Sequence, residues 1–123
     1  MDLGLSYTST TIVSNTNTAL TLGSGDMDVF ATPAMVALME NAAMNAVAPH
    51  LEQGQTTVGT EISTTHIKAS ALGATITATA ILTAVDGRKL TFSVTACEGD
   101  TLIGTGTHTR FVVDRERFMS KLK

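Results

Sequence analysis

The segment TPAMVALMENAAMNAV, residues 32–47, carries the strongest helix signal in the chain. Thr32 is a residue type that caps helix N-termini, and Pro33 suits the first helical position, where its missing N–H costs nothing. Pro49 and Gly54 follow as stop signals. Between these ends the segment is almost entirely Ala, Met, Val and Leu. The pattern therefore predicts a long helix that lies in the interior of the protein.

Glu40 is the charged exception within this helix. On a helical wheel it shares an apolar arc with Val36 and Ala43, whereas Asn41 and Asn45 form a separate polar stripe roughly 100° to 140° away. A carboxylate in apolar surroundings is costly unless it finds a partner. One interpretation is a structural hydrogen bond, or exposure at a subunit edge. The other is a general base or nucleophile.

Most of the remaining sequence alternates between polar and apolar residues, which is typical of strands with one buried face. The clearest case is GATITATAILTAVDG, residues 73–87, where Thr alternates with apolar residues and Asp-Gly signals a hairpin turn. Residues 98–100, EGD, predict a second turn. We expect a short exposed helix at 114–123. Strands are expected at the following ranges: 4–13, 56–70, 73–86, 89–97 and 101–113, with a further short one at 18–22.

One long apolar helix can bury itself against an antiparallel sheet only if the sheet curves around it. The small residues Ala37, Ala42, Ala43 and Ala46 let the sheet approach the helix closely. The sequence therefore predicts an α+β fold of the hot-dog type, with a long central helix wrapped by a curved antiparallel sheet. No linker or repeat divides the chain, so residues 1–123 are expected to form a single domain.

The composition limits the possible functions of the chain. Of its 123 residues 43% are hydrophobic but only 4% are aromatic, and the net charge is -3. Without a basic stripe or stacking aromatics, nucleic-acid binding has little support. The most apolar stretch, residues 29–47, is interrupted by Glu40, Asn41 and Asn45, so it does not fit a membrane span. The N-terminus lacks the pattern of a secretory signal. The lone cysteine, Cys97, suits a reducing compartment, so we expect a cytoplasmic protein.

The three histidines differ in their positions along the chain. His66 shares a predicted strand face with Val58 and Ile62, and it is either a core histidine with its hydrogen bonds satisfied or the partner of Glu40. His50 follows the helix end, where the helix dipole favours it. His108, in the last strand, either lines a ligand channel or is exposed. Three scattered histidines and one cysteine have no metal-ligand spacing, so no metal site is predicted.

Thr32 and Gly59 each have a structural and a functional interpretation. Thr32 is either a simple helix cap or a hydroxyl that holds a carbonyl oxygen at the positive helix end. Glu40 lies eight positions after Thr32, roughly 12 Å along a helix, so substrate or a second subunit must connect them. Gly59 weakens a strand unless something approaches it closely. One interpretation is a bulge or close packing of the strand against the helix. The other is that Gly59 leaves room for an acyl chain or a pantetheine arm.

Two long segments, VFATPAMVALMENAAMNAVAPHLEQGQTTVGTEISTTH and VDGRKLTFSVTACEGDTLIGTGTHTRFVVDRERF, resemble the fluoroacetyl-CoA thioesterase-like family of hot-dog thioesterases. The resemblance spans roughly residues 29 to 119. It places the family's catalytic Thr/Glu/His set on Thr32, Glu40 and His66, and its substrate-contacting glycine on Gly59. It also implies a homodimer with active sites at the subunit interface, and it leaves open whether two dimers pair into a dimer of dimers.

The GTH…R strand of that family corresponds to Gly106, Thr107, His108 and Arg110, which the resemblance places near the path of CoA. The fluoroacetyl-selective member carries aromatic lid residues before the helix, and the segment LGSGDMD at 22–28 has none. Fluoroacetyl selectivity is therefore not predicted for this chain. His108 and Arg110, with Gly59, are the expected substrate-binding residues.

The resemblance predicts an acyl-CoA thioesterase that converts a short or medium acyl thioester into acid and CoA without a cofactor. Glu40 would act as base or nucleophile, His66 would assist proton transfer, and Thr32 would orient the carbonyl or water. An alternative is a non-catalytic module that binds acyl-CoA or another small ligand. A hot-dog enoyl-CoA hydratase is a third possibility, although its usual Asp and His motif is absent.

Overall fold

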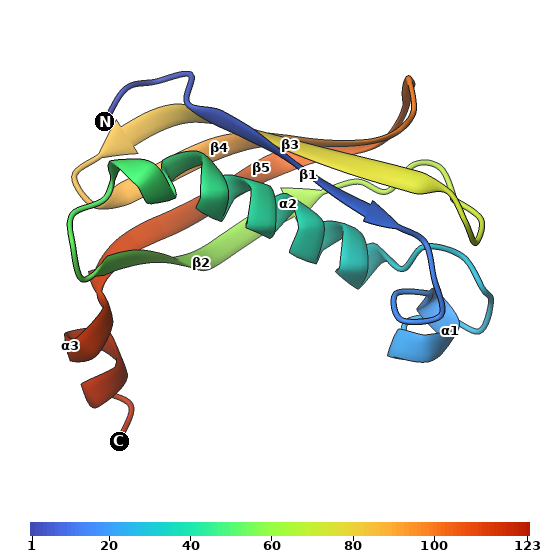
Figure 1. Cartoon of the computed structure of the whole chain (residues 1–123), viewed down its shortest axis with the longest axis horizontal. Helices are drawn as coiled ribbons and strands as arrows, with labels where there is room; N and C mark the ends of the chain where they lie inside the picture. The colour runs from blue at the N-terminus through green and yellow to red at the C-terminus, as the bar shows by residue number, and fades with distance from the viewer.

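The computed structural model describes all residues from Met1 to Lys123. Five antiparallel strands form one sheet in the order β1-β3-β4-β5-β2, so β1 and β2 are its two edges. The sheet curves around the long helix α2 (Figure 1). The elements in chain order are β1 (Ser6–Ile12), α1 (Ala19–Leu22), α2 (Thr32–Val47), the short 3₁₀ helix η1 (Ala48–His50), β2 (Gln55–Thr64), β3 (Thr75–Asp86), β4 (Lys89–Glu98), β5 (Thr101–Asp114) and α3 (Arg115–Ser120).

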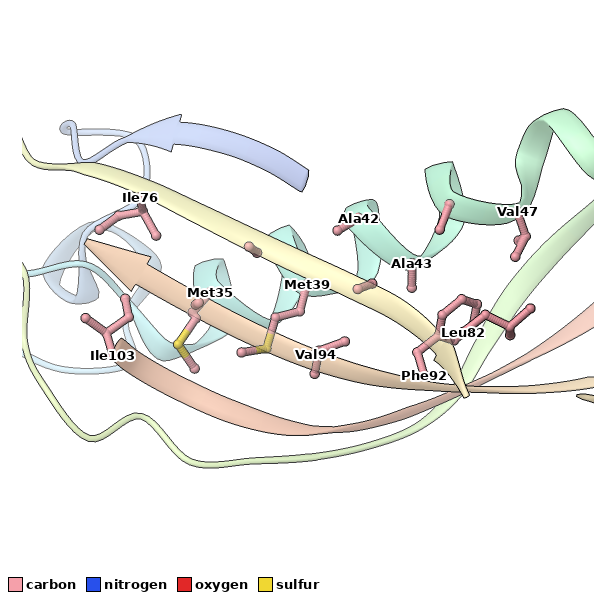
Figure 2. Packing of buried hydrophobic residues seen from close by; sticks show 14 of the residues in the cluster. Met35, Met39, Ala42, Ala43, Val47, Ile76, Leu82, Phe92, Val94 and Ile103 are labelled. Carbon is pink, nitrogen blue, oxygen red and sulfur yellow. The ribbon is translucent and has the colours of Figure 1, made fainter. Parts of the chain in front are cut away.

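The hydrophobic core lies between α2 and the concave face of the sheet (Figure 2). The helix contributes Met35, Met39, Ala42, Ala43 and Val47, all with no exposed surface. Helix α2 packs mainly on β1 and β3 and makes few contacts with β2. The side of the helix that faces β2 is therefore the open side of the molecule.

Alternation along the strands explains the rest of the core. Side chains that point toward the helix are buried in both hairpin strands, and they are Ile76, Ala78, Ala80 and Leu82 in β3 and Leu90, Phe92, Val94 and Ala96 in β4. The predicted turns at Asp86-Gly87 and Glu98–Asp100 connect the strands as expected. The central helix predicted at 32–47 is confirmed as α2, and the tail helix predicted at 114–123 is present as α3 but covers only Arg115–Ser120.

Three local predictions are wrong. The segment at 18–22 is not a strand, because the Thr18 side chain accepts a hydrogen bond from the Thr21 N–H at 3.2 Å and caps the single helical turn α1. Thr32 is not the helix cap, because Ala31 takes that position and Thr32 is the first helical residue. Finally, the strand predicted at 56–70 covers only Gln55–Thr64. His66 therefore lies just beyond β2.

The chain beyond β2 still follows β5 for a few residues. The N–H groups of Thr65 and Ile67 donate to the carbonyls of Thr105 and Ile103. A Cβ at Gly104 would overlap the Thr65 carbonyl oxygen, so this glycine is needed for the close approach. No helix in the structure has the length and hydropathy needed to cross a membrane.

Candidate active site

Thr32 and His66 form a direct pair at the N-terminal end of α2. The Thr32 Oγ1 atom lies 2.7 Å from His66 Nδ1, a hydrogen-bond distance. Because Ala31 occupies the cap position, the Thr32 hydroxyl is not used to cap the helix. The ring of Phe30 packs edge-on against His66, with a centroid separation of 6.4 Å. The loop after β2 and the start of α2 thus hold this pair in place.

Burial lowers the pKa of His66, and the backbone at Lys68 opposes this effect. A lowered pKa favours the neutral ring at physiological pH, in which one ring nitrogen accepts and the other donates. Its Nε2 atom is buried without a hydrogen-bond partner. A cleft of about 220 Å³ lies beside the pair and is lined by Thr32, His66, Phe30 and Lys68, among others. The pair therefore borders a space in which a small group can bind.

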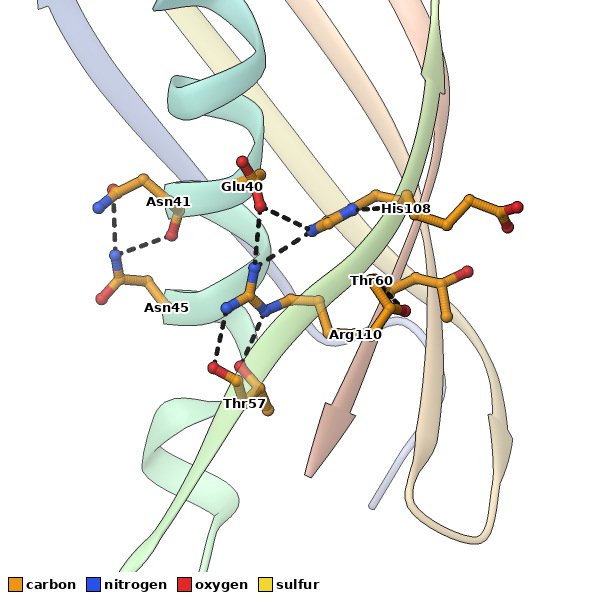
Figure 3. A network of polar contacts seen from close by, with 9 residues as sticks. Glu40, Asn41, Asn45, Thr57, Thr60, His108 and Arg110 are labelled. Atoms are coloured by element: carbon orange, nitrogen blue, oxygen red, sulfur yellow. Dashed lines mark hydrogen bonds and ion pairs between the residues drawn. The ribbon is translucent and has the colours of Figure 1, made fainter. Parts of the chain in front are cut away.

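Glu40 belongs to a second polar cluster, in the middle of α2 (Figure 3). Its Oε2 atom lies 3.6 Å from Arg110 Nη1 and 3.9 Å from His108 Nε2. The Glu40 side chain is 41% exposed in the single chain, so the apolar arc of the helix does not bury this carboxylate completely. The structure places Glu40 on the open side of the helix, toward β2, where it meets two side chains from β5.

Arg110 is held in a fixed orientation by its neighbours. Its Nε donates to Thr57 Oγ1 at 2.8 Å, and its Nη2 donates to the Thr57 carbonyl oxygen at 3.0 Å. Burial lowers the pKa of Arg110, whereas the charge of Glu40 opposes this change. An arginine remains a cation even so. The guanidinium is therefore a preorganised positive group beside Glu40.

His108 completes the second cluster. It is 1% exposed, which rules out the exposed position that the sequence left open. Its Nδ1 lies 2.7 Å from the Glu61 carbonyl oxygen, so Nδ1 carries the proton. Nε2 is then free to accept from Arg110 Nη1 at 3.2 Å. Burial lowers the pKa of His108; the Glu61 backbone opposes this shift, Arg110 adds to it, and Glu40 opposes it. The neutral ring of His108 therefore helps to fix the position of the Arg110 guanidinium by accepting this hydrogen bond.

Gly59 lies in β2, next to the point where the side chains of Glu40, His108 and Arg110 meet. A Cβ built on Gly59 would lie 2.5 Å from Glu40 Oε2, 3.1 Å from His108 Cε1 and 3.2 Å from Arg110 Nη1. The predicted close approach at this glycine is confirmed, and the approaching group is the Glu40 carboxylate. The strand also has an irregular register between Gly59 and Glu61. Gly59 thus leaves room for the second cluster.

The structure does not pair Glu40 with His66 within the chain. His66 contacts Thr32, and Glu40 contacts Arg110 and His108. Asn41 explains part of this arrangement, because it accepts a hydrogen bond from Ser9 Oγ at 2.7 Å and so orients the polar stripe of the helix toward β1.

The sequence analysis also missed Thr57, which holds the Arg110 guanidinium. An inward-facing arginine on β5 should have prompted a search for its partner on the neighbouring strand β2.

A family model described as fluoroacetyl-CoA-specific thioesterase matches residues 13–116 of the chain. The chain belongs to this family. It is therefore a thioesterase, an enzyme that hydrolyses acyl-CoA thioesters. The fluoroacetyl-CoA thioesterase of Streptantibioticus cattleyicolor is 47% identical over 96 residues, which cover 78% of this chain and 69% of the relative.

Solved structures agree with this assignment. A variant of the fluoroacetyl-CoA-specific thioesterase in complex with fluoroacetate and CoA superposes with a TM-score of 0.89 at 40% identity, covering 96% of this chain and 99% of that one. A hot-dog-like protein from Thermanaerovibrio acidaminovorans has a TM-score of 0.89 at 22% identity, with 99% and 90% coverage. The predicted hot-dog fold and the family resemblance are both confirmed.

Proposed function

We propose that this thioesterase hydrolyses short- or medium-chain acyl-CoA through Thr32, Glu40 and His66, in sites formed between two copies of the chain. The observation that carries this proposal is the Thr32–His66 contact of 2.7 Å beside a cleft. Glu40 supports it as the half-exposed carboxylate on the open side of the same helix. The resemblance to the family's Thr/Glu/His set assigns these residues their roles.

A second copy is proposed because the two clusters are separate in one chain. Glu40 lies eight positions after Thr32 in the helix, which corresponds to roughly 12 Å along the axis. Glu40 lies toward β2, an edge strand whose outer backbone groups have no partner in the single chain. Antiparallel pairing of two β2 edges around a two-fold axis brings the Thr32–His66 end of one copy toward Glu40 of the other. Each dimer then has two equivalent sites.

The proposed chemistry requires no metal or cofactor. In one route Glu40 removes a proton from water, the water oxygen bonds to the acyl carbon, and the carbon–sulfur bond breaks. In the other route a Glu40 oxygen bonds to the acyl carbon and displaces the thiolate, and water then hydrolyses the mixed anhydride. In both routes the CoA thiolate takes up a proton through His66, and Thr32 orients the carbonyl or the water.

Gly59, His108 and Arg110 are the proposed substrate-binding residues. The fixed guanidinium of Arg110 provides a positive group next to Glu40, where an acyl oxygen develops negative charge. His108 holds that guanidinium, and the missing side chain of Gly59 leaves room for the Glu40 carboxylate beside it. The named relatives act on fluoroacetyl-CoA or bind fluoroacetate. Because residues 22–28 contain no aromatic side chain, we do not propose that this chain selects for fluorine.

Thiol release from a panel of acetyl-, fluoroacetyl-, butyryl- and octanoyl-CoA tests the proposal. We expect steady turnover of at least one short or medium ester by the wild type. Glu40→Gln should reduce kcat by about 100-fold or more, in the range of losing a general base. Asn45→Gln, on the polar stripe of the same helix, is the control and should retain activity. An unchanged rate in Glu40→Gln overturns the assignment of Glu40.

A further inference from the structure

The end of the sheet that holds the β3–β4 turn and the C-terminus of β5 carries most of the positive charge of this net-acidic chain. All lysines and arginines except Lys68 and Arg110 lie in two short segments, 88–89 and 115–123. These segments are the β3–β4 turn and the tail with α3, which lies beyond the end of β5 (Figure 1). The acidic residues at this end are Asp86, Asp114, Glu116 and Glu52, the last in the loop whose Gly54 carbonyl accepts from the Arg115 N–H. This end of the molecule is therefore positive, and the remainder is negative.

A cleft of about 290 Å³ lies between the turn and α3. Three of its lining side chains are cationic: Arg88, Arg117 and Lys121. Asp114 is its acidic lining residue, and that carboxylate already accepts a hydrogen bond from the Arg117 N–H at 3.0 Å as the cap of α3. The lining thus carries an excess of positive charge. Ligand pockets typically begin at about 300 Å³, so the cleft suits one anionic group better than a whole nucleotide.

The cations of this cleft have no ion-pair partners in the structure. Both ion pairs of the chain involve Glu40, which is not part of the cleft. Arg88 is tethered to the strand at the cleft floor: its Nη1 donates to the Val112 carbonyl at 3.3 Å, and its own carbonyl accepts from the Val112 N–H at 2.9 Å. Its remaining donors are available. Guanidinium groups bind phosphate through paired hydrogen bonds, and a lysine adds a compact charge.

We propose that this cleft binds a phosphate group of the nucleotide end of the acyl-CoA substrate. The ligand identity rests on the proposed function. A phosphomonoester carries a charge of about −1.5 to −2 at pH 7 and three acceptor oxygens, which match the arginine and lysine donors. Strand β5 connects the proposed active site with the cleft, because its Arg110 lies beside Glu40 and its residues Val112 to Asp114 line the cleft. Two to four strand residues span roughly 7–14 Å, a separation of the order that a pantetheine arm bridges.

Steady-state kinetics with two matched substrates tests this inference. Acyl-CoA contains the nucleotide phosphates, and the corresponding acyl-pantetheine lacks them. For the double variant Arg117→Gln/Lys121→Gln we expect KM for acyl-CoA to rise about tenfold or more, as for the loss of one charge-assisted hydrogen bond, with kcat unchanged. The value of kcat/KM for acyl-pantetheine should not change. Arg115→Gln/Lys123→Gln removes the same charge outside the cleft lining and should leave both substrates unaffected.

Equal kinetics of Arg117→Gln/Lys121→Gln and wild type on acyl-CoA would overturn the inference, as would equal losses on both substrates. Direct titration with 3′-phosphoadenosine 5′-diphosphate separates this inference from the proposed function. If that nucleotide binds the wild type and binds the double variant at least tenfold more weakly, the cleft assignment stands even if hydrolysis is not detected. If inorganic phosphate competes as well as the nucleotide, the cleft is a general anion site and the assignment to CoA is wrong.

Discussion

At the scale of single residues, Gly59 controls whether the second polar cluster can form. Its missing side chain leaves the space that Glu40 Oε2 occupies, with His108 and Arg110 on the other sides. Arg110 and His108 cannot retreat freely, since Arg110 is bound to Thr57 and His108 to the Glu61 carbonyl. The half-exposed Glu40 side chain is therefore the one that would move. The glycine is thus required by packing around the carboxylate. Its backbone φ is not in the left-handed region.

Gly59→Ala should therefore displace the Glu40 carboxylate. We expect kcat/KM for acyl-CoA to fall by about 10- to 100-fold, the scale of a misplacement of about 1 Å at a reacting group. The melting temperature should change little, because Gly59 is exposed. Thr60→Ala, at the next position of β2, is the control and should keep most of its activity. Full activity in Gly59→Ala would show that Glu40 does not act from this position.

His66 and His108 predict how stability depends on pH. Burial lowers the pKa of both from the ordinary value of 6.5, so the folded chain binds fewer protons than the unfolded chain just below that pH. The free energy of unfolding should therefore decrease as the pH falls below 6.5, until both rings are protonated in the folded state. Denaturant titrations at about pH 7.5 and about pH 5.5 measure the change.

His66→Gln should reduce this dependence on pH, because one of the two buried rings is removed. His50→Gln is the matched control, since His50 is exposed at the end of η1. An equal free energy of unfolding at both pH values in the wild type would contradict the lowered pKa values of the two rings.

At the scale of elements, α2 combines two functions on different sides. Its buried side packs mainly on β1 and β3 and supplies Met35 and Met39 to the core. Its open side carries Glu40, and its first residue is Thr32. A stable contact between the helix and the sheet is what fixes these two residues relative to β5 and to the loop after β2. Core packing therefore sets the geometry of the site.

Two methionines of this helix allow a matched test of that packing. Met39 has no exposed surface, whereas Met44 is 37% exposed. Met39→Ala should lower the free energy of unfolding by about 2–5 kcal/mol, because it removes buried atoms and leaves a cavity. Met44→Ala should cost less than about 1 kcal/mol. Chemical denaturation measures both values, and equal effects of the two substitutions would contradict the orientation of α2.

Much of this fold could be predicted from sequence because its patterns are local. The limits of α2 follow from Pro33 and Pro49, and the period of two in β3 identifies its buried face. The start of the helix was less predictable, since Ala31 takes the cap position although Thr32 is the residue type that usually caps helices. The extent of β2 was misjudged because Thr65 and Ile67 keep hydrogen bonds to β5 after the regular strand has ended.

The candidate site was predictable as a set of residues but not as a set of contacts. Glu40 stands out by its position on an apolar helix, and the family resemblance joins it to Thr32 and His66. The structure, however, gives His66 the partner Thr32 and gives Glu40 the partners Arg110 and His108. These contacts depend on how β2 pairs with β5, which places Gly59 opposite Arg110. Pairing between distant strands leaves no local signal in the sequence.

At the scale of the whole molecule, the chain presents separate parts of one proposed site. Thr32 and His66 lie at one end of α2, Glu40 lies near its middle, and the cationic cleft lies at the other end of the sheet. A two-fold dimer through β2 would bring the Thr32–His66 pair of one copy toward Glu40 and the cleft of the other. The same pairing would also cover the free edge of β2, which would otherwise be open to nonspecific strand pairing.

Mixing two inactive variants tests this central claim most directly. Glu40→Gln and His66→Ala are unfolded together, refolded together and assayed for thiol release from acyl-CoA. If each site combines Glu40 of one copy with Thr32 and His66 of the other, half of the refolded dimers contain both variants and each of these has one intact site. Activity should then return to about one quarter of the wild-type value per chain. Activity no higher than that of either variant refolded alone would contradict a shared site.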